Sequence, residues 1–269
     1  MEMIEFLSYD FVQRAIIAGC LMAIVSGLLG VFLVLRRLSL IGDGLAHVSF
    51  FSIGLALFLK THPFYVSIPV VGLASVGILN LTKKTRMMSD SAIGIVSALG
   101  IACAIILTSL AGGFNVDIFS YLFGSILTVS TTEVFMVVIL FLVVIAMILL
   151  FYNDLFCVTF DEECAKLANI NVGLINHMFV ILTSITIVIA LKLMGIMLVS
   201  ALLIFPAVTA LELKKDFQTT LIISSLTGVI SVAGGIILGF LLNLPSSASI
   251  VLVNFVLFLA AFVYKKIRK

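Results

Sequence analysis

Long apolar stretches recur from one end of the chain to the other, separated by short polar connections. A helix needs about 20 apolar residues to cross the hydrocarbon core of a bilayer. Hydrophobic residues make up 63% of the 269 residues, more than a soluble domain of this length can bury. The sequence therefore predicts an all-α polytopic membrane protein. Nine spans are expected, at residues 12–35, 41–59, 64–81, 91–111, 133–152, 173–191, 195–211, 218–242 and 248–264.

The basic residues set the expected orientation, because cytoplasmic loops of membrane proteins are enriched in Lys and Arg. With the N-terminus outside and the C-terminus cytoplasmic, only Arg14, Lys60 and Lys192 of the 15 basic residues lie outside. No soluble domain is expected, so residues 1–269 are predicted to form a single transmembrane domain. The stretch DIFSYLFGSIL at 117–127 is the weakest point of this topology, since it could form a re-entrant or interfacial helix, or a short tenth span.

Two rows of small residues have the spacing that lets helices approach closely in lipid. The first row is Gly19, Ala23 and Gly27, and the second is Ser231, Gly235 and Gly239. We expect both to lie at helix contacts, although glycine and alanine are also simply common in membrane helices.

Asp43 and His47 are the informative polar residues inside the predicted spans. They are four residues apart, so they share one face of a helix, and a charge there costs about 2.5–3.5 kcal/mol to insert. A carboxylate and an imidazole are good ligands for zinc or manganese. Two alternatives are a mutual contact that ties helices together and a proton relay. Because zinc prefers four ligands, a second copy of the chain meeting at a two-fold axis would complete the site.

The other two histidines are expected at the surface. His62 follows the second span next to Pro63, and His177 lies at the inner start of a later span.

The predicted span at 195–211 contains a proline. Pro206 removes a backbone donor and frees the carbonyl of Leu202, and Ser200 and Thr209 add hydroxyl groups nearby. These residues are candidates for lining a transport pathway. An ordinary proline kink explains them equally well.

A polar segment at about 153–172 is expected on the cytoplasmic side. Acidic residues precede a short amphipathic stretch there, as suits the N-terminal end of a helix. Such a helix could dock a cytosolic partner, whereas a solvated loop is the simpler interpretation. The residues concerned are Asp161, Glu162, Glu163, Ala165, Lys166 and Leu167.

Several catalytic motifs are missing from the sequence. It contains no P-loop, no HExxH and no GxSxG. The chain is therefore not expected to be an enzyme or to bind ATP through a P-loop.

Five segments in order along the chain carry a family resemblance. They are RRLSLIGDGLAHVSF, THPFYVSIPV, VDIFSYLFGSIL, FDEECAKLANINV and LKLMGIMLVSALLIFPAVTA. With these motifs the chain resembles the ABC-3 family, the membrane permeases of bacterial zinc and manganese ABC importers. The form GDGLAH and the PFY that follows the second span are similar to the zinc branch.

The resemblance implies the partners and the roles of residues. Two permease chains would form the path in the bacterial cell membrane, a separate cytosolic ATP-binding subunit would hydrolyse ATP, and an extracellular metal-binding protein would deliver the ion. Asp43 and His47 would contact the metal in transit, and the segment from Asp161 to Leu167 would be the coupling helix. Zn²⁺, or Mn²⁺, would be the transported substrate. No permanent cofactor and no nucleic acid are expected.

The predicted function is therefore that of the permease of an ATP-driven divalent-metal importer, with zinc as the expected ion and manganese as the alternative. A secondary metal carrier driven by an ion gradient and a membrane enzyme are the rival classes.

Overall fold

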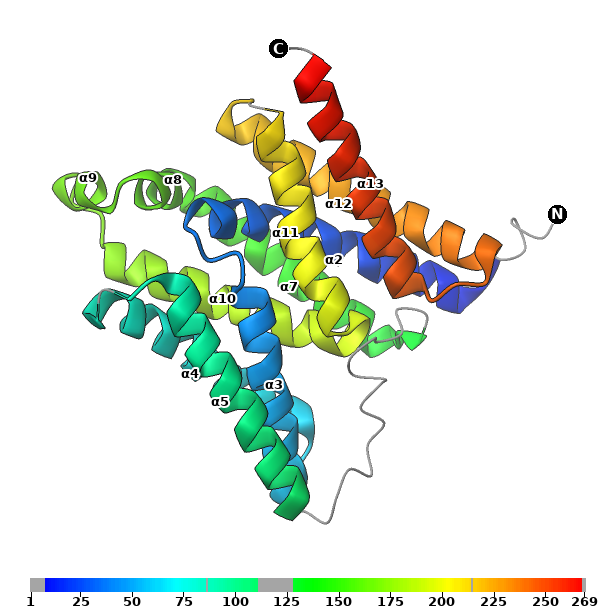
Figure 1. Ribbon diagram of the computed structural model, residues 1–269, viewed down its shortest axis with the longest axis horizontal. Coiled ribbons are helices and arrows are strands. Elements are labelled where there is room, and N and C mark those ends of the chain that lie inside the picture. Colours follow the sequence, from blue (N-terminus) through cyan, green and yellow to red (C-terminus); the bar gives the residue numbers. More distant parts are fainter. Residues whose placement is uncertain (1–7, 86, 111–127, 214, 268–269) are drawn as a thin grey trace. The chain divides into compact units, whose positions relative to one another are not determined.

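The structure is a computed structural model that describes residues 8–85, 87–110, 128–213 and 215–267. These residues form eleven helices and no strand (Figure 1). The helices are α2 (Asp10–Leu35), α3 (Ile41–Phe58), α4 (Pro63–Thr85), α5 (Ser89–Leu110), α7 (Thr131–Leu150), α8 (Tyr152–Phe160), α9 (Glu162–Leu167), α10 (Val172–Met194), α11 (Ile196–Glu212), α12 (Phe217–Leu242) and α13 (Ser246–Ile267).

A helix coincides with each of the nine predicted ranges, and the all-α polytopic fold is confirmed. Seven of these helices are long and apolar enough to cross a membrane. The other two, α3 and α11, are apolar over shorter stretches, Ile41–Ala56 and Ile196–Glu212. The count of nine spans and the orientation of the termini remain predictions. The segment at 117–127 lies outside the described residues.

The chain divides into two compact units. The first contains α11, α12, α13 and most of α2 and α7, and the second contains α3, α4, α5, α8, α9 and most of α10. Their ranges are, within the described residues, Met1–Val34, Phe119–Ala146 and Ile189–Lys269 for the first unit, and Leu35–Ile118 and Met147–Val188 for the second.

Small residues allow close helix packing in the first unit, as both rows predict. A Cβ atom at Gly27 of α2 would lie 3.0 Å from the carbonyl oxygen of Ser224 in α12. The Ser224 hydroxyl donates a hydrogen bond of 2.8 Å to the carbonyl of Gly27, so the two backbones are joined directly. In the second row, a Cβ atom at Gly235 would lie 2.4 Å from the Cα atom of Ile250 in α13. The prediction that these rows mark helix contacts is confirmed at Gly27 and Gly235.

Another close approach in this unit is at a residue that neither row includes. A Cβ atom at Gly30 would lie only 2.1 Å from the carbonyl oxygen of Leu203, and 3.3 Å from the Cβ atom of Ala207. Any residue with a Cβ atom at position 30 would collide with α11, so the packing here requires glycine.

The helix ends in the first unit follow local chemistry. Gly195 has φ 80° and ψ 167°, a conformation open essentially to glycine, and it alone separates α10 from α11. Asp216 caps α12 by accepting a hydrogen bond from the Thr219 backbone N–H at 3.0 Å. That bond favours the charged carboxylate, so it lowers the pKa of Asp216.

In the second unit, α3, α4 and α5 pack on one another, and α3 and α5 run side by side (Figure 1). The connection from α2 to α3 covers only residues 36–40 and contains Arg37 in a left-handed conformation, with φ 56°. Ile41, the first residue of α3, donates its backbone N–H to the carbonyl of Leu38 at 3.0 Å. A short, hydrogen-bonded turn therefore fixes where α3 begins.

Candidate functional site

Asp43 and His47 lie one turn apart on α3, as their spacing predicts. The His47 Nε2 atom is 3.6 Å from the Asp43 Oδ2 atom, which is longer than a hydrogen bond. The Asp43 side chain is 52% exposed and that of His47 is 27% exposed. Both groups therefore have room for an additional partner.

The helix that carries this pair packs closely on α5. A Cβ atom at Gly44 would lie 2.5 Å from the Cγ2 atom of Ile93, and one at Gly100 would lie 3.1 Å from the carbonyl oxygen of His47. Two glycines, one on each helix, thus bring α3 and α5 into close contact. Asp43 is exposed and His47 is half-buried, whereas the residues between them, from 44 to 46, are buried.

The spacing of the two ligand atoms suits one bound metal ion. Zinc takes oxygen and nitrogen ligands at about 2.1 Å, so two ligands at a tetrahedral angle are roughly 3.4 Å apart. The observed separation is 3.6 Å. The described part of the chain contains no group of three or more His, Cys, Asp or Glu residues placed to hold a metal. In a metal site at this position, Asp43 and His47 would supply two ligands, and the others would come from elsewhere.

His62 and His177 make only local contacts. The Nδ1 atom of His62 accepts a hydrogen bond from the Phe64 backbone N–H at 3.3 Å. The Nδ1 atom of the half-buried His177 lies 2.7 Å from the carbonyl oxygen of Gly173, one turn earlier in the same helix. Neither imidazole lies beside Asp43 or His47 in these contacts.

The candidate pathway residues lie on α11, which continues through Pro206 without interruption. Pro206 and Thr209 are buried, and the Thr209 hydroxyl donates to the carbonyl of Phe205 at 2.7 Å. The hydroxyl of Ser200 is buried without a hydrogen-bond partner among the described residues. A role of these three residues in lining a pathway stays a prediction.

The predicted coupling segment contains two short helices, α8 and α9, that meet at Asp161. The Asp161 carboxylate accepts hydrogen bonds from the backbone N–H groups of Glu163, at 2.9 Å, and Cys164, at 3.1 Å. This cap explains why a helix of only six residues forms here. Leu167, at its end, is 90% exposed, an unusual position for a leucine outside the long apolar helices.

Glu163 and Lys166 form an ion pair within α9. The Lys166 Nζ atom donates to the Glu163 Oε1 atom at 2.6 Å, and this contact raises the pKa of Lys166. Because both side chains are exposed, the pair adds little to stability. This ion pair of the Glu163 side chain thus stays within α9.

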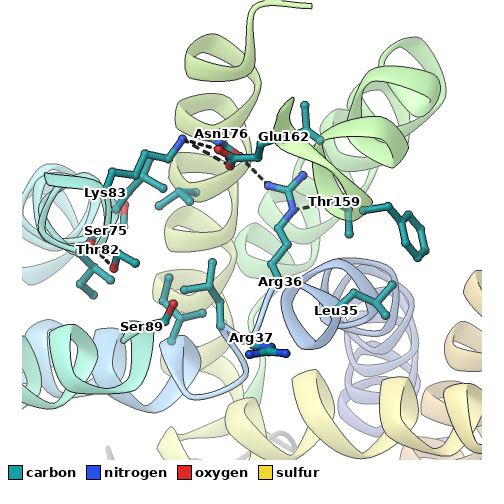
Figure 2. Close-up of a pocket in the computed structure, with 17 residues that line it drawn as sticks. Leu35, Arg36, Arg37, Ser75, Thr82, Lys83, Ser89, Thr159, Glu162 and Asn176 are labelled. Carbon is teal, nitrogen blue, oxygen red and sulfur yellow. Dashed lines mark hydrogen bonds and ion pairs between the residues drawn. The ribbon is translucent and has the colours of Figure 1, made fainter. Parts of the chain in front are cut away.

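Glu162, by contrast, turns towards a cavity of about 370 Å³ in the second unit. Figure 2 shows Glu162 between Lys83 of α4 and the side chains of Asn176 and Arg36. Its Oε1 atom lies 3.4 Å from the Lys83 Nζ atom and accepts a hydrogen bond from the Asn176 Nδ2 atom at 2.8 Å. One carboxylate therefore joins three helices, α4, α9 and α10.

Arg36 is the central cation beside this cavity. Its Nη1 atom donates to the Asn176 Oδ1 atom and its Nε atom to the Thr159 Oγ1 atom, both at 2.9 Å. The guanidinium carbon also lies 4.6 Å from the centre of the Phe179 ring. Burial lowers the pKa of Arg36 to about 10, while the charge of Glu162 opposes the shift, so the group stays protonated at neutral pH.

The sequence did not reveal this network. From the sequence, Arg36 is predicted only to be one of the cations that set orientation, and Glu162 only to be part of a docking surface. Their partners lie on other helices: Thr159 is 123 residues from Arg36, and Lys83 is 79 residues from Glu162. Ion pairs in the first unit likewise join different helices: Lys192 with Glu133, at 2.9 Å, and Lys265 with Glu212.

Comparison with known sequences gives matches over nearly the whole chain. The model of the ABC 3 transport family matches residues 8–265. The manganese transport system membrane protein MntC of Listeria monocytogenes is 33% identical over 259 residues, covering 96% of this chain and 92% of that protein. The high-affinity zinc uptake system membrane protein ZnuB of Haemophilus influenzae is 25% identical over 250 residues, covering 93% of this chain and 96% of that protein.

Comparison with solved structures also gives a match over nearly the whole chain. A chain of PsaBC from Streptococcus pneumoniae in complex with Fab has a TM-score of 0.85 and 31% identity to this chain. The match covers 97% of this chain and 94% of that chain. Fold and sequence are thus similar over the same extent.

Proposed function

The chain belongs to the ABC-3 transport family, and from this premise we propose that it is the membrane permease of an ATP-driven importer of divalent transition metals. It is a multi-pass protein of the bacterial inner membrane. In this proposal a separate cytosolic subunit hydrolyses ATP, an extracellular binding protein delivers the ion, and two copies of the permease form the path between them. The names of MntC and ZnuB, which are transport-system membrane proteins, support this division of labour.

The exposure of Asp43 is the observation that carries the proposal. A carboxylate facing lipid inside a membrane costs about 2.5–3.5 kcal/mol, yet the Asp43 side chain is 52% exposed in a single chain. A water-lined path, or a second copy of the chain across a two-fold axis, would remove that cost. A facing copy would add its own Asp and His, giving four ligands around one ion.

The cargo that these ligands fit is a divalent transition metal. Imidazole nitrogen favours zinc, whereas carboxylate oxygen also suits manganese, so a mixed site discriminates weakly between them. The sequence motifs favour zinc. The name of the Listeria relative, at 33% identity, refers to manganese, and that of the Haemophilus relative, at 25% identity, refers to zinc. We propose that the site accepts both ions and that one of them is the physiological cargo.

Transport in this proposal follows alternating access. The ATP-binding subunits close on ATP and move α9, the path opens outward, and Asp43 and His47 receive the ion. Two ligands from each copy hold the ion long enough for the path to reopen inward, and they release it when the pair separates.

Uptake of zinc and manganese by the complete transporter tests this function. In a strain that lacks the chain, we expect loss of high-affinity uptake of one of these ions, restored by the wild-type gene. In vesicles containing the permease and its ATPase, uptake should require ATP and should persist when a protonophore collapses the proton gradient. Uptake that needs no ATPase but disappears with the proton gradient would instead establish a secondary carrier.

The coupling role of α9 can be tested at Glu163, which points away from the rest of the unit. Exchanging Glu163, whose side chain is 82% exposed, for lysine should leave the fold intact. It should weaken the stimulation of ATP hydrolysis by the metal-loaded binding protein by about tenfold, because a like charge across a docking surface costs several kcal/mol at most. Hydrolysis is measured with the purified complete transporter.

A matched control for this charge reversal is Asp90→Lys at the exposed start of α5. Asp90 lies in the same unit and outside α9, so its exchange should leave the stimulation at the wild-type level. Equal stimulation in Glu163→Lys and wild type would remove α9 from the docking surface.

A further inference from the structure

Two neighbouring acids of α9 have different surroundings. Glu163 pairs with Lys166 inside α9, whereas Glu162 contacts Lys83 of α4 and Asn176 of α10. A movement of α9 that displaces Glu162 therefore acts directly on two long helices of the second unit.

The side-chain amide of Asn176 connects Glu162 to Arg36. Its Nδ2 atom donates a hydrogen bond to Glu162 at 2.8 Å, and its Oδ1 atom accepts one from Arg36 at 2.9 Å. Asn176 is buried, and so it cannot exchange either partner for water without opening the packing around it. The three side chains thus form one continuous hydrogen-bonded connection, seen in Figure 2.

Arg36 is held tightly at the far end of this connection. Besides Asn176 it donates to Thr159 of α8, and its guanidinium lies over the ring of Phe179 in α10. A half-buried guanidinium that loses such bonds is left with an unsatisfied charge. Arg36 should therefore follow Asn176 and Thr159 when these residues move.

Arg36 also lies at the start of the helix that carries the metal ligands. Four residues separate it from Ile41, which is 1% exposed and begins α3, and Asp43 lies in the first turn. The intervening turn is closed by the hydrogen bond from Ile41 to Leu38 and includes Arg37 with φ 56°. Such a short, packed turn transmits a displacement of Arg36 to the first turn of α3.

We propose that Glu162, Asn176 and Arg36 form a transmission element that links the position of α9 to the position of Asp43 and His47. The inference rests on the proposed function and adds how the ATPase reaches the metal site within one unit. All three are positioning residues, since none of them touches the ion or the nucleotide.

Glu162→Gln is the decisive variant. It keeps the size and the acceptor oxygen of the side chain but replaces a charge-assisted hydrogen bond with a neutral one, and Glu162 is only half-buried, so the chain should fold. In vesicles containing the complete transporter, we expect ATP hydrolysis close to the wild-type rate. The number of Zn²⁺ or Mn²⁺ ions taken up per ATP hydrolysed should fall by about tenfold.

The control for this variant is Asp90→Asn, which removes a carboxylate charge from the same unit at an exposed position. It should keep the wild-type ratio of ions to ATP. A loss of assembly in Glu162→Gln would lower uptake and hydrolysis together, so the ratio separates coupling from structural damage.

A double-mutant cycle tests whether Arg36 and Glu162 act in one connection. Arg36→Gln should lower the same ratio, and combining it with Glu162→Gln should add little further loss. Lys84→Gln, which removes an exposed cation of α4 outside the network, should keep the ratio of wild type. If Arg36→Gln does not assemble, Glu162→Gln alone decides the question.

The outcomes distinguish this inference from the proposed function. A wild-type ratio in Glu162→Gln, or additive losses in the cycle, would overturn the transmission element while leaving the importer function in place. Wild-type vesicles that take up neither ion with ATP would overturn the function itself.

Discussion

Replacing His47 with alanine is expected to reduce metal uptake by about 100-fold or more, while the amount of protein in the membrane stays unchanged. Loss of a single supporting contact to a metal ligand already costs about 10–100-fold in affinity, and this exchange removes a ligand from each copy. His47 packs through its backbone against Gly100, so its imidazole can be removed without separating α3 from α5. Uptake in vesicles and the level of protein on immunoblots measure the two effects.

His177→Ala is the matched control, because the Nδ1 atom of this half-buried imidazole lies beside the carbonyl of Gly173 in its own helix, α10. It should transport like wild type. Asp43→Asn should reproduce the loss seen in His47→Ala, since it removes the negative oxygen ligand. Full uptake by His47→Ala would exclude the imidazole from the path.

Adding a single methyl group at Gly30 is expected to destabilise the chain by about 3 kcal/mol or more. The new Cβ atom would lie 2.1 Å from the carbonyl oxygen of Leu203, a backbone atom that cannot rotate away. The helices α2 and α11 would have to separate, and packing contacts that hold helices together in lipid would be lost. The melting temperature and the monodisperse yield of the Gly30→Ala protein in detergent report the effect.

Gly77→Ala provides the opposite case. A Cβ atom at Gly77 in α4 meets nothing within 4 Å, and alanine favours a helix over glycine by about 1 kcal/mol. This variant should therefore melt at or above the wild-type temperature. If Gly30→Ala had the same melting temperature as Gly77→Ala, α2 and α11 would not approach as closely as the structure indicates.

Much of the fold could be predicted because the signals are local. Apolar stretches long enough to cross a bilayer predicted every long helix, and each predicted range coincides with one of them. The spacing of four residues placed Asp43 beside His47, and small residues at the same spacing marked the contacts of Gly27 and Gly235. In each of these spacings, the residues that carry the signal lie within one or two turns of a single helix.

What could not be predicted depends on residues far apart in the chain. Nothing near Arg36 in the sequence distinguishes a cation that meets Asn176, 140 residues away, from one that faces water at the inner surface. The different surroundings of Glu162 and Glu163 likewise arise from where α4 and α10 lie. The contact of Gly30 with Leu203 belongs to the same class, because it depends on how α2 and α11 cross.

The exposure of Asp43 has a consequence for how the proposed transporter would be made in the cell. If two permease chains pair at α3 as proposed, an unpaired chain would hold Asp43 against lipid, and pairing would relieve two such carboxylates, together about 5–7 kcal/mol. Under this proposal, unpaired chains should be short-lived substrates for membrane proteases, and the rate at which chains find one another after synthesis should set the cellular level of the permease.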